Sequence, residues 1–75
     1  METLSPMQKK TYDFIVDYID EHGYSPTFRE IGKGLYLAST ESVHAHLQGL
    51  VKKGYIRYEK GKPRTIVILK GYENV

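Results

Sequence analysis

The sequence contains no cysteine and no long hydrophobic run, and it has only 75 residues. Without cysteine, the chain has no disulfide framework, thiolate zinc site or cysteine nucleophile, and a reducing cytoplasm fits it best. Its longest apolar runs, residues 14–16 and 66–69, fall far short of the ~20 residues that a membrane span requires. We therefore expect one small cytoplasmic domain over residues 1–75, with too little core for a buried catalytic cleft.

Motifs for catalysis and metal binding are also missing. No glycine-rich phosphate loop follows a predicted strand, and no Ser–His–Asp arrangement is indicated by the spacing. The three histidines, His22, His44 and His46, have no cysteine partner and lack the i, i+4 pairing of a zinc-binding helix. The sequence therefore predicts a protein that is not an enzyme and has no metal, cofactor or small-molecule ligand.

Charge is unevenly distributed along the chain. Residues 1–50 contain four Lys or Arg and seven Asp or Glu, which gives a net charge of −3. Residues 51–75 contain seven basic and two acidic residues, a net charge of +5. Such a basic C-terminal part favours a polyanionic partner. A solvated basic strip without a partner is the alternative on charge alone.

Signals of helix initiation and termination predict a first helix over residues 6–22. Ser5 and Gln8 form a capping box around Pro6, a residue that suits the first helical turn, and Gly23 supplies a left-handed stop. Apolar residues recur at helical spacing at Phe14, Ile15, Tyr18 and Ile19, and Met7 and Thr11 continue this stripe toward the start of the helix.

Two further helices follow. Thr27 and Glu30 form a second capping box, which opens a short helix that ends near residues 33–35. Ser39 or Thr40 caps a third helix, which Gly54 ends. The residues expected to face the core are Phe28, Ile31 and Leu35 in the second helix and Val43, Leu47, Leu50 and Val51 in the third.

The periodicity changes after residue 54. Residues 55–59 alternate like a half-buried strand, 65–69 are strongly strand-forming, and the turn between them carries three cations. Three helices followed by a two-stranded antiparallel hairpin predict an α+β, winged helix-turn-helix domain. The helix-turn-helix covers about 28–48 and the wing about 55–69. A three-helix bundle with an unrelated hairpin is the alternative.

The outer face of the third helix is rich in small polar groups at its N-terminal end. A helix that enters the DNA major groove needs this composition, because short donors and acceptors must reach base edges. Glu41 either accepts from a cytosine or stabilises the helix dipole, and His46 is more simply a half-buried structural residue than a ligand. We predict base reading by Ser39, Thr40, Glu41, Ser42, His44, Ala45 and Gln48.

Other polar and basic residues are candidates for contacts with the DNA backbone. The tip of the predicted wing carries Lys60, Lys62 and Arg64, and cations also occur at the end of the third helix. Such residues position a protein on DNA without specifying the sequence. The full predicted set is Thr27, Arg29, Lys52, Lys53, Lys60, Lys62 and Arg64. The tyrosines are better explained as core residues than as platforms on which bases stack.

Several segments resemble the DNA-binding domain of the LexA family of SOS-response repressors. They include residues 24–32 (YSPTFREIG), 43–47 (VHAHL) and 62–66 (KPRTI), and the likeness covers about residues 4–69. The resemblance implies a bacterial or phage transcriptional repressor whose third helix reads a double-stranded operator while the wing meets the backbone. Because a single module of this size binds one half-site weakly, we also expect a palindromic operator and a weak homodimer formed on the DNA.

The chain departs from the family pattern at three places. Glu41 stands where small hydroxyl residues are usual, which affects the operator sequence that is read. Tyr36 stands where glycine is usual, so a left-handed backbone there would cost roughly 1–2 kcal/mol. The family continues into a self-cleaving domain with a Ser/Lys pair, and we expect no self-cleavage from residues 1–75.

A winged-helix module that binds a protein partner is the alternative function. A protein interface would favour exposed apolar or aromatic anchors on the third helix or the wing. The small polar tip of the third helix and the basic C-terminal part favour DNA instead.

Overall fold

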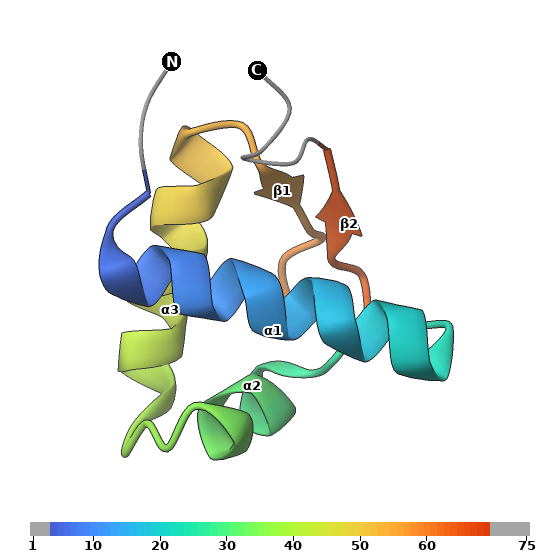
Figure 1. The fold of residues 1–75 in the computed structure, drawn as a ribbon, viewed down its shortest axis with the longest axis horizontal. Helices are drawn as coiled ribbons and strands as arrows, with labels where there is room; N and C mark the ends of the chain where they lie inside the picture. The colour runs from blue at the N-terminus through green and yellow to red at the C-terminus, as the bar shows by residue number, and fades with distance from the viewer. Residues whose placement is uncertain (1–3, 70–75) are drawn as a thin grey trace.

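The computed structural model describes residues 4–69, in which three helices precede a two-stranded antiparallel hairpin (Figure 1). The helices are α1 (Pro6–His22), α2 (Phe28–Gly34) and α3 (Thr40–Lys52), and the strands are β1 (Ile56–Arg57) and β2 (Val67–Ile68). α1 packs across α3, α2 lies below them in Figure 1, and the hairpin stands beside α3. This arrangement confirms the predicted winged helix-turn-helix.

Local capping bonds explain where the helices begin. The Ser5 hydroxyl accepts from the Gln8 N–H at 3.2 Å, and the Gln8 side chain accepts from the Ser5 N–H at 3.0 Å. Thr27 and Glu30 make the same reciprocal pair at the start of α2. Both predicted capping boxes are therefore confirmed. Gly23, at φ 80°, ends α1 in the predicted left-handed conformation.

The core lies where α1, α2, α3 and the hairpin meet. The apolar stripe of α3 is buried as predicted. The predicted stripe of α1 is buried at Thr11 and Ile15, and Tyr12, which the sequence did not place on it, is buried beside them. Tyr12 is only 5% exposed, and its ring meets Tyr55 edge-on at 5.8 Å between centroids. The buried hydrophobic residues are Tyr12, Ile15, Ile31, Val43, Leu47, Leu50, Tyr55, Ile56 and Ile66.

The turn between α2 and α3 contains a strained residue. Tyr36 has φ 58°, so the residue that replaces the usual glycine adopts the left-handed conformation itself. Its side chain is 95% exposed and contributes no packing that would offset this cost. Gly34 has a different role, because a Cβ there would overlap the ring of Phe14. The glycine at 34 therefore permits close packing of α2 against α1. It does not relieve the backbone strain two residues later, at Tyr36.

The hairpin is shorter than predicted. Only Ile56 with Ile68 and Arg57 with Val67 pair across it, whereas the sequence indicated strands of five residues. The Ile66 N–H donates to the Ser25 hydroxyl at 3.2 Å instead of to the opposite strand. These predicted strands were too long because bonds to the α1–α2 loop replace part of the ladder.

Arg64 ties the wing to the helices. Its guanidinium makes a two-pronged ion pair with Glu30, with nitrogen–oxygen distances of 3.1 and 3.0 Å. It also donates to the Ser25 carbonyl at 3.1 Å and lies 4.8 Å from the centroid of the Tyr24 ring. The hydrogen bond from the Thr27 N–H and the bonds from Arg64 lower the pKa of Glu30 from 4.5 to about 2.

Replacing Tyr36 with glycine should stabilise the domain. Glycine removes the steric cost of positive φ but loses more entropy on folding, so we expect a gain of about 0.5–1 kcal/mol. Urea unfolding would measure the gain. Tyr36→Ala, which keeps the steric cost and removes the exposed ring, should show no gain. Equal stabilisation by both variants would assign the effect to the ring instead.

The Glu30–Arg64 pair should make stability depend on pH in the acid range. Because the pKa of Glu30 is lower in the folded chain, its carboxylate stabilises the fold above about pH 4.5, and this contribution is lost as the pH falls toward 2. We expect wild type to exceed Glu30→Gln by a constant margin above pH 4.5, and the margin to shrink below it. Urea unfolding at several pH values tests this, and parallel profiles would contradict it.

Candidate nucleic-acid interface

The outer face of α3 presents most of the residues predicted to read bases. Residues 39–41, 44, 45 and 48 are exposed, and Ser42 is half-buried. The opposite face, which carries Val43, Leu47 and Leu50, is fully buried in the core. The structure therefore brings all seven predicted reading residues to one side or to the start of one helix.

The start of α3 offers hydrogen-bonding groups at the surface. Ser39 caps the helix by accepting from the Ser42 N–H at 3.4 Å, and the two hydroxyls lie 3.4 Å apart. Thr40 is exposed beside them, and Glu41 is exposed in the first turn, where a carboxylate stabilises the helix dipole. This end of α3 can present hydroxyls and one carboxylate to a partner without moving a core residue.

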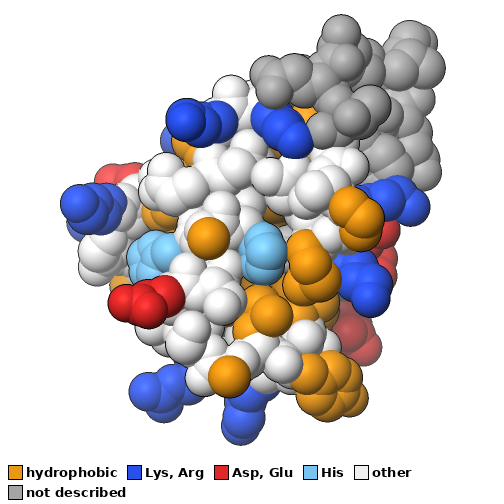
Figure 2. Space-filling view, turned by 90° about the vertical axis from the view of Figure 1, so that its left-hand side faces the viewer, with side chains coloured by type: hydrophobic (Ala, Val, Ile, Leu, Met, Phe, Trp, Pro, Cys, Tyr) orange, Lys and Arg blue, Asp and Glu red, His pale blue; other side chains and the backbone are white. Residues whose placement is uncertain are grey.

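The surface around α3 has cations mainly at its margin. Figure 2 shows the left-hand side of Figure 1, which α3 and the start of α1 form. Uncharged polar groups and backbone cover much of this face, one histidine lies near its middle and another to the left, and hydrophobic side chains gather to the right of and below the central histidine. Lys and Arg side chains lie mostly around the edge. This distribution suits a duplex, whose bases need neutral donors and acceptors and whose phosphates need cations.

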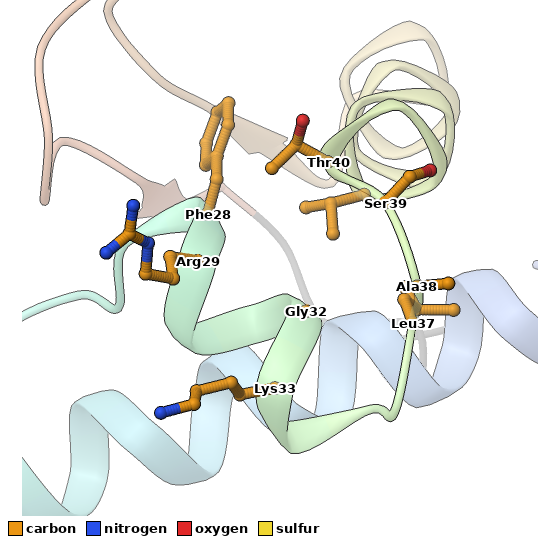
Figure 3. Close-up of a pocket in the computed structure, with 9 residues that line it drawn as sticks. Phe28, Arg29, Gly32, Lys33, Leu37, Ala38, Ser39 and Thr40 are labelled. Carbon is orange, nitrogen blue, oxygen red and sulfur yellow. The ribbon is translucent and has the colours of Figure 1, made fainter.

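A hollow of about 190 Å³ separates α2 from the start of α3 (Figure 3). Ser39 and Thr40 lie on one side of it. Arg29 and Lys33 extend from α2 on the other side, pointing away from α3. Both cations are exposed, and they are four residues apart, so they share one helix face. The arrangement offers cations on α2 and hydroxyls on α3 to the same partner.

Two further hollows lie between α3 and the wing. One, of about 250 Å³, is lined by His44 and Gln48 from α3 and by Tyr58, Lys60 and Gly61 from the wing, with Phe28 and Val51. The adjoining hollow, of about 330 Å³, extends to Lys62 and Pro63. α3 and the wing therefore flank one continuous depression whose wing side carries two exposed lysines.

Two of the predicted reading residues have protein partners. The His44 ring packs edge-on against Phe28 with centroids 4.7 Å apart. The Gln48 Nε2 donates to the Tyr58 hydroxyl at 3.0 Å. Both side chains are nevertheless exposed, so these contacts orient them without withdrawing them from the surface.

The predicted backbone-contacting residues fall into two groups. Arg29, Lys52, Lys60 and Lys62 are exposed, and Lys62 lies 3.8 Å from Glu59 in an ion pair whose two side chains are both more than 60% exposed. Such an exposed pair competes weakly with a phosphate. The other three are engaged within the protein: Lys53 with Gln8 at 2.7 Å, Arg64 with Glu30, and Thr27 as the cap of α2. Arg29 lies beside the hollow between α2 and α3.

The alternatives that the sequence left open are partly resolved by burial. His46 is half-buried, as predicted for a structural residue, and Tyr12 and Tyr55 are core residues. The exposed large hydrophobic residues described within 4–69 are Tyr24, Tyr36, Val67 and Leu69, and α3 carries none of them. Its outer face therefore lacks the apolar anchors of a protein interface.

Three residues that border these surfaces were not in the predicted site. Lys33 shares a face with Arg29, and the i, i+4 spacing on a predicted helix could have indicated it. Phe28 and Tyr58 were assigned to packing only, yet both line the depression beside His44 and Gln48. Nothing in the sequence indicates that the wing folds back far enough for Tyr58 to reach α3.

Within residues 4–69, no group of three or more acidic or histidine side chains is placed to hold a metal ion. None of the three helices in that part of the chain is long and apolar enough to cross a membrane.

Comparison with known sequences identifies a family. Residues 1–65 match the LexA DNA binding domain. The LexA repressor of Clostridium novyi (strain NT) is 57% identical over 63 residues, which cover 84% of this chain and 31% of that protein. The LexA repressors of Desulfatibacillum aliphaticivorans and Bacillus mycoides (strain KBAB4) are 46% and 49% identical over 93% and 92% of this chain.

The chain spans about a third of the length of these curated relatives. The shared part is the one that matches the DNA-binding family, and its three helices and hairpin are the elements described above. The chain therefore belongs to the LexA DNA-binding domain family.

Proposed function

We propose that this chain binds double-stranded operator DNA sequence-specifically and so acts as the DNA-binding part of a transcriptional repressor, in the cytoplasm. The start of α3 enters the major groove, and the wing lies on the adjacent backbone. The observation that supports this most strongly is the small, polar, exposed end of α3 with exposed cations on both sides. The repressor names of relatives that are 46–57% identical support it independently.

The dimensions of α3 agree with this docking. A helix of 13 residues is about 20 Å long, and the major groove, about 12 Å wide, admits one helix. The first turns would place Ser39, Thr40, Glu41, Ser42, His44 and Ala45 toward base edges, as in other helix-turn-helix proteins. Because α3 is anchored by its buried stripe, these residues would approach DNA as a rigid unit.

The phosphate contacts divide between direct and indirect roles. Lys60 and Lys62 on the wing, Arg29 on α2 and Lys52 on α3 would meet phosphates themselves, with Thr27 and Lys53 as secondary contacts. Arg64 would act mainly by holding the wing in place, because its guanidinium already pairs with Glu30 and Ser25. Phosphate contacts fix the register of the protein on DNA, whereas base contacts specify the sequence.

A single domain of this size would bury roughly 600–1,000 Å² on DNA, which gives modest affinity. We therefore propose that two copies occupy a palindromic operator and associate weakly on it. The interaction of a winged helix with a protein partner stays the second candidate, supported only by the exposed Tyr24 and Tyr36 away from α3.

Selection of bound sequences from a random duplex pool tests the proposal directly. Enrichment of a defined half-site would support it, and enrichment in inverted pairs would support the palindrome. A pool from which no sequence is enriched would contradict sequence-specific binding and favour the protein-partner alternative.

Ser42→Ala and His44→Ala should each reduce the preference for operator over random DNA. Neither side chain is in the core, so folding should persist, and the lost base contact should cost about 1–3 kcal/mol at one base-pair position. Titrations with operator and random duplex measure the preference, and circular dichroism checks the fold. Leu47→Ala is the contrast, because a core deletion should cost roughly 2–5 kcal/mol of stability and weaken all binding. If the surface variants lose both affinities equally, α3 does not read bases.

Changing Lys60 and Lys62 together to alanine should weaken binding to all duplexes by a similar factor. Each lost phosphate contact should make the slope of log K against log salt concentration shallower by about 0.9. Binding titrations at several salt concentrations measure this slope. Arg64→Ala should differ, because it releases the wing as well as removing a charge. A slope that stays the same in the double variant would exclude the wing lysines from the interface.

A further inference from the structure

A hydrogen bond joins the reading helix to the wing. The Nε2 of Gln48, on the exposed face of α3, donates to the Tyr58 hydroxyl at 3.0 Å. Tyr58 follows β1, just before the wing tip. The two residues are ten positions apart in the chain. Gln48 belongs to α3, which would contact bases, and Tyr58 belongs to the wing, which would contact phosphates.

The Tyr58 ring is fixed by packing rather than by this bond. It is half-buried against the core cluster, and it meets Phe28 edge-on at 5.2 Å with an interplanar angle of 89°. The same Phe28 ring contacts His44, at 4.7 Å and 85°. Phe28 therefore sets the position of Tyr58 relative to α3. Because Gln48 is exposed and Tyr58 is packed, the bond positions the Gln48 amide rather than the tyrosine.

The bond to Tyr58 leaves part of the Gln48 amide available for hydrogen bonds to DNA. A glutamine amide has two N–H donors and one carbonyl acceptor, and Tyr58 uses one of the donors. One N–H and the carbonyl oxygen remain. This is the pair that matches N7 and the N6 amino group of adenine in the major groove.

The surroundings of Gln48 suit a DNA strand. The depression of about 250 Å³ between α3 and the wing is lined by Gln48, His44 and Tyr58, and it also contains Lys60. The neighbouring hollow brings Lys62 to the same depression. A strand with phosphates at these lysines would hold its base edges toward α3, where Gln48 lies.

We propose that Gln48 reads an adenine of an A·T pair, and that Tyr58 is the positioning residue that holds the Gln48 amide for this contact. This inference rests on the proposed operator binding. It adds which base Gln48 reads, and it assigns to Tyr58 the role of orienting the side chain that reads this base.

The test is selection from a random duplex pool with wild type, Gln48→Ala, Tyr58→Phe and the double variant. Tyr58→Phe keeps the ring that packs on Phe28 and removes only the hydroxyl. Tyr24→Phe is the matched control, since Tyr24 is exposed and lies outside the residues that line the depression. Thermal unfolding of each variant confirms that the fold is kept.

We expect wild type and Tyr24→Phe to require A·T at one position of the half-site. Gln48→Ala should lose this preference by roughly tenfold or more, and Tyr58→Phe should lose part of it, with all other positions unchanged. The double variant should match Gln48→Ala, because Tyr58 acts only through Gln48. A purely structural role of Tyr58 would instead weaken every position and add to the loss from Gln48→Ala.

A base analogue gives a second readout. Replacing the adenine at that position by 7-deazaadenine removes the N7 acceptor, and should weaken binding by wild type but not by Gln48→Ala. The inference is overturned if all variants select the same sequence, if the position requires G·C, or if Tyr58→Phe matches wild type. If wild type enriches no sequence at all, the proposed function itself fails, which is a different result from a half-site that ignores Gln48.

Discussion

Burial of one apolar stripe of α3 is the constraint on which the other features depend. Val43, Leu47 and Leu50 have at most 1% of their surface exposed, and they make up three of the nine buried hydrophobic core residues within 4–69. In so small a domain this stripe fixes the rotation of α3 about its axis. Because the stripe must face inward, the small polar residues opposite it must face outward. The chemistry of the outer face of α3 is thus a consequence of packing.

The wing depends on a second, polar constraint. A two-stranded hairpin alone is marginally stable, and here only two residue pairs form its ladder. The Ser25 hydroxyl and the Glu30 carboxylate supply what the ladder lacks, by binding the Ile66 N–H and the Arg64 guanidinium. Glu30 also caps α2, so one carboxylate joins the beginning of the helix-turn-helix to the wing. The orientation of the wing relative to α3 follows from these bonds and from Phe28, which contacts both His44 and Tyr58.

The turn between α2 and α3 contains a strained backbone conformation at Tyr36. Gly34 is required where α2 meets Phe14, and the left-handed position two residues later is taken by Tyr36. The surrounding contacts, including the Leu37 N–H bond to the Gly32 carbonyl at 2.8 Å, hold the turn in this shape. A single turn therefore combines a glycine needed for space and a tyrosine strained in its backbone.

The sequence by itself determined the helices, because the capping boxes at Ser5 and Thr27 and the period of the α3 stripe are local signals that neighbouring residues satisfy. It also determined which residues lie on the outer face of α3, and the order of elements that defines the fold. Only the tertiary structure decided that Tyr12 joins the buried face of α1, how short the strands are, and that Arg64 pairs with Glu30 while Tyr58 reaches Gln48. These features join residues 10 to 41 positions apart. Their partners are chosen by the packing of whole elements, which no local pattern of residues encodes.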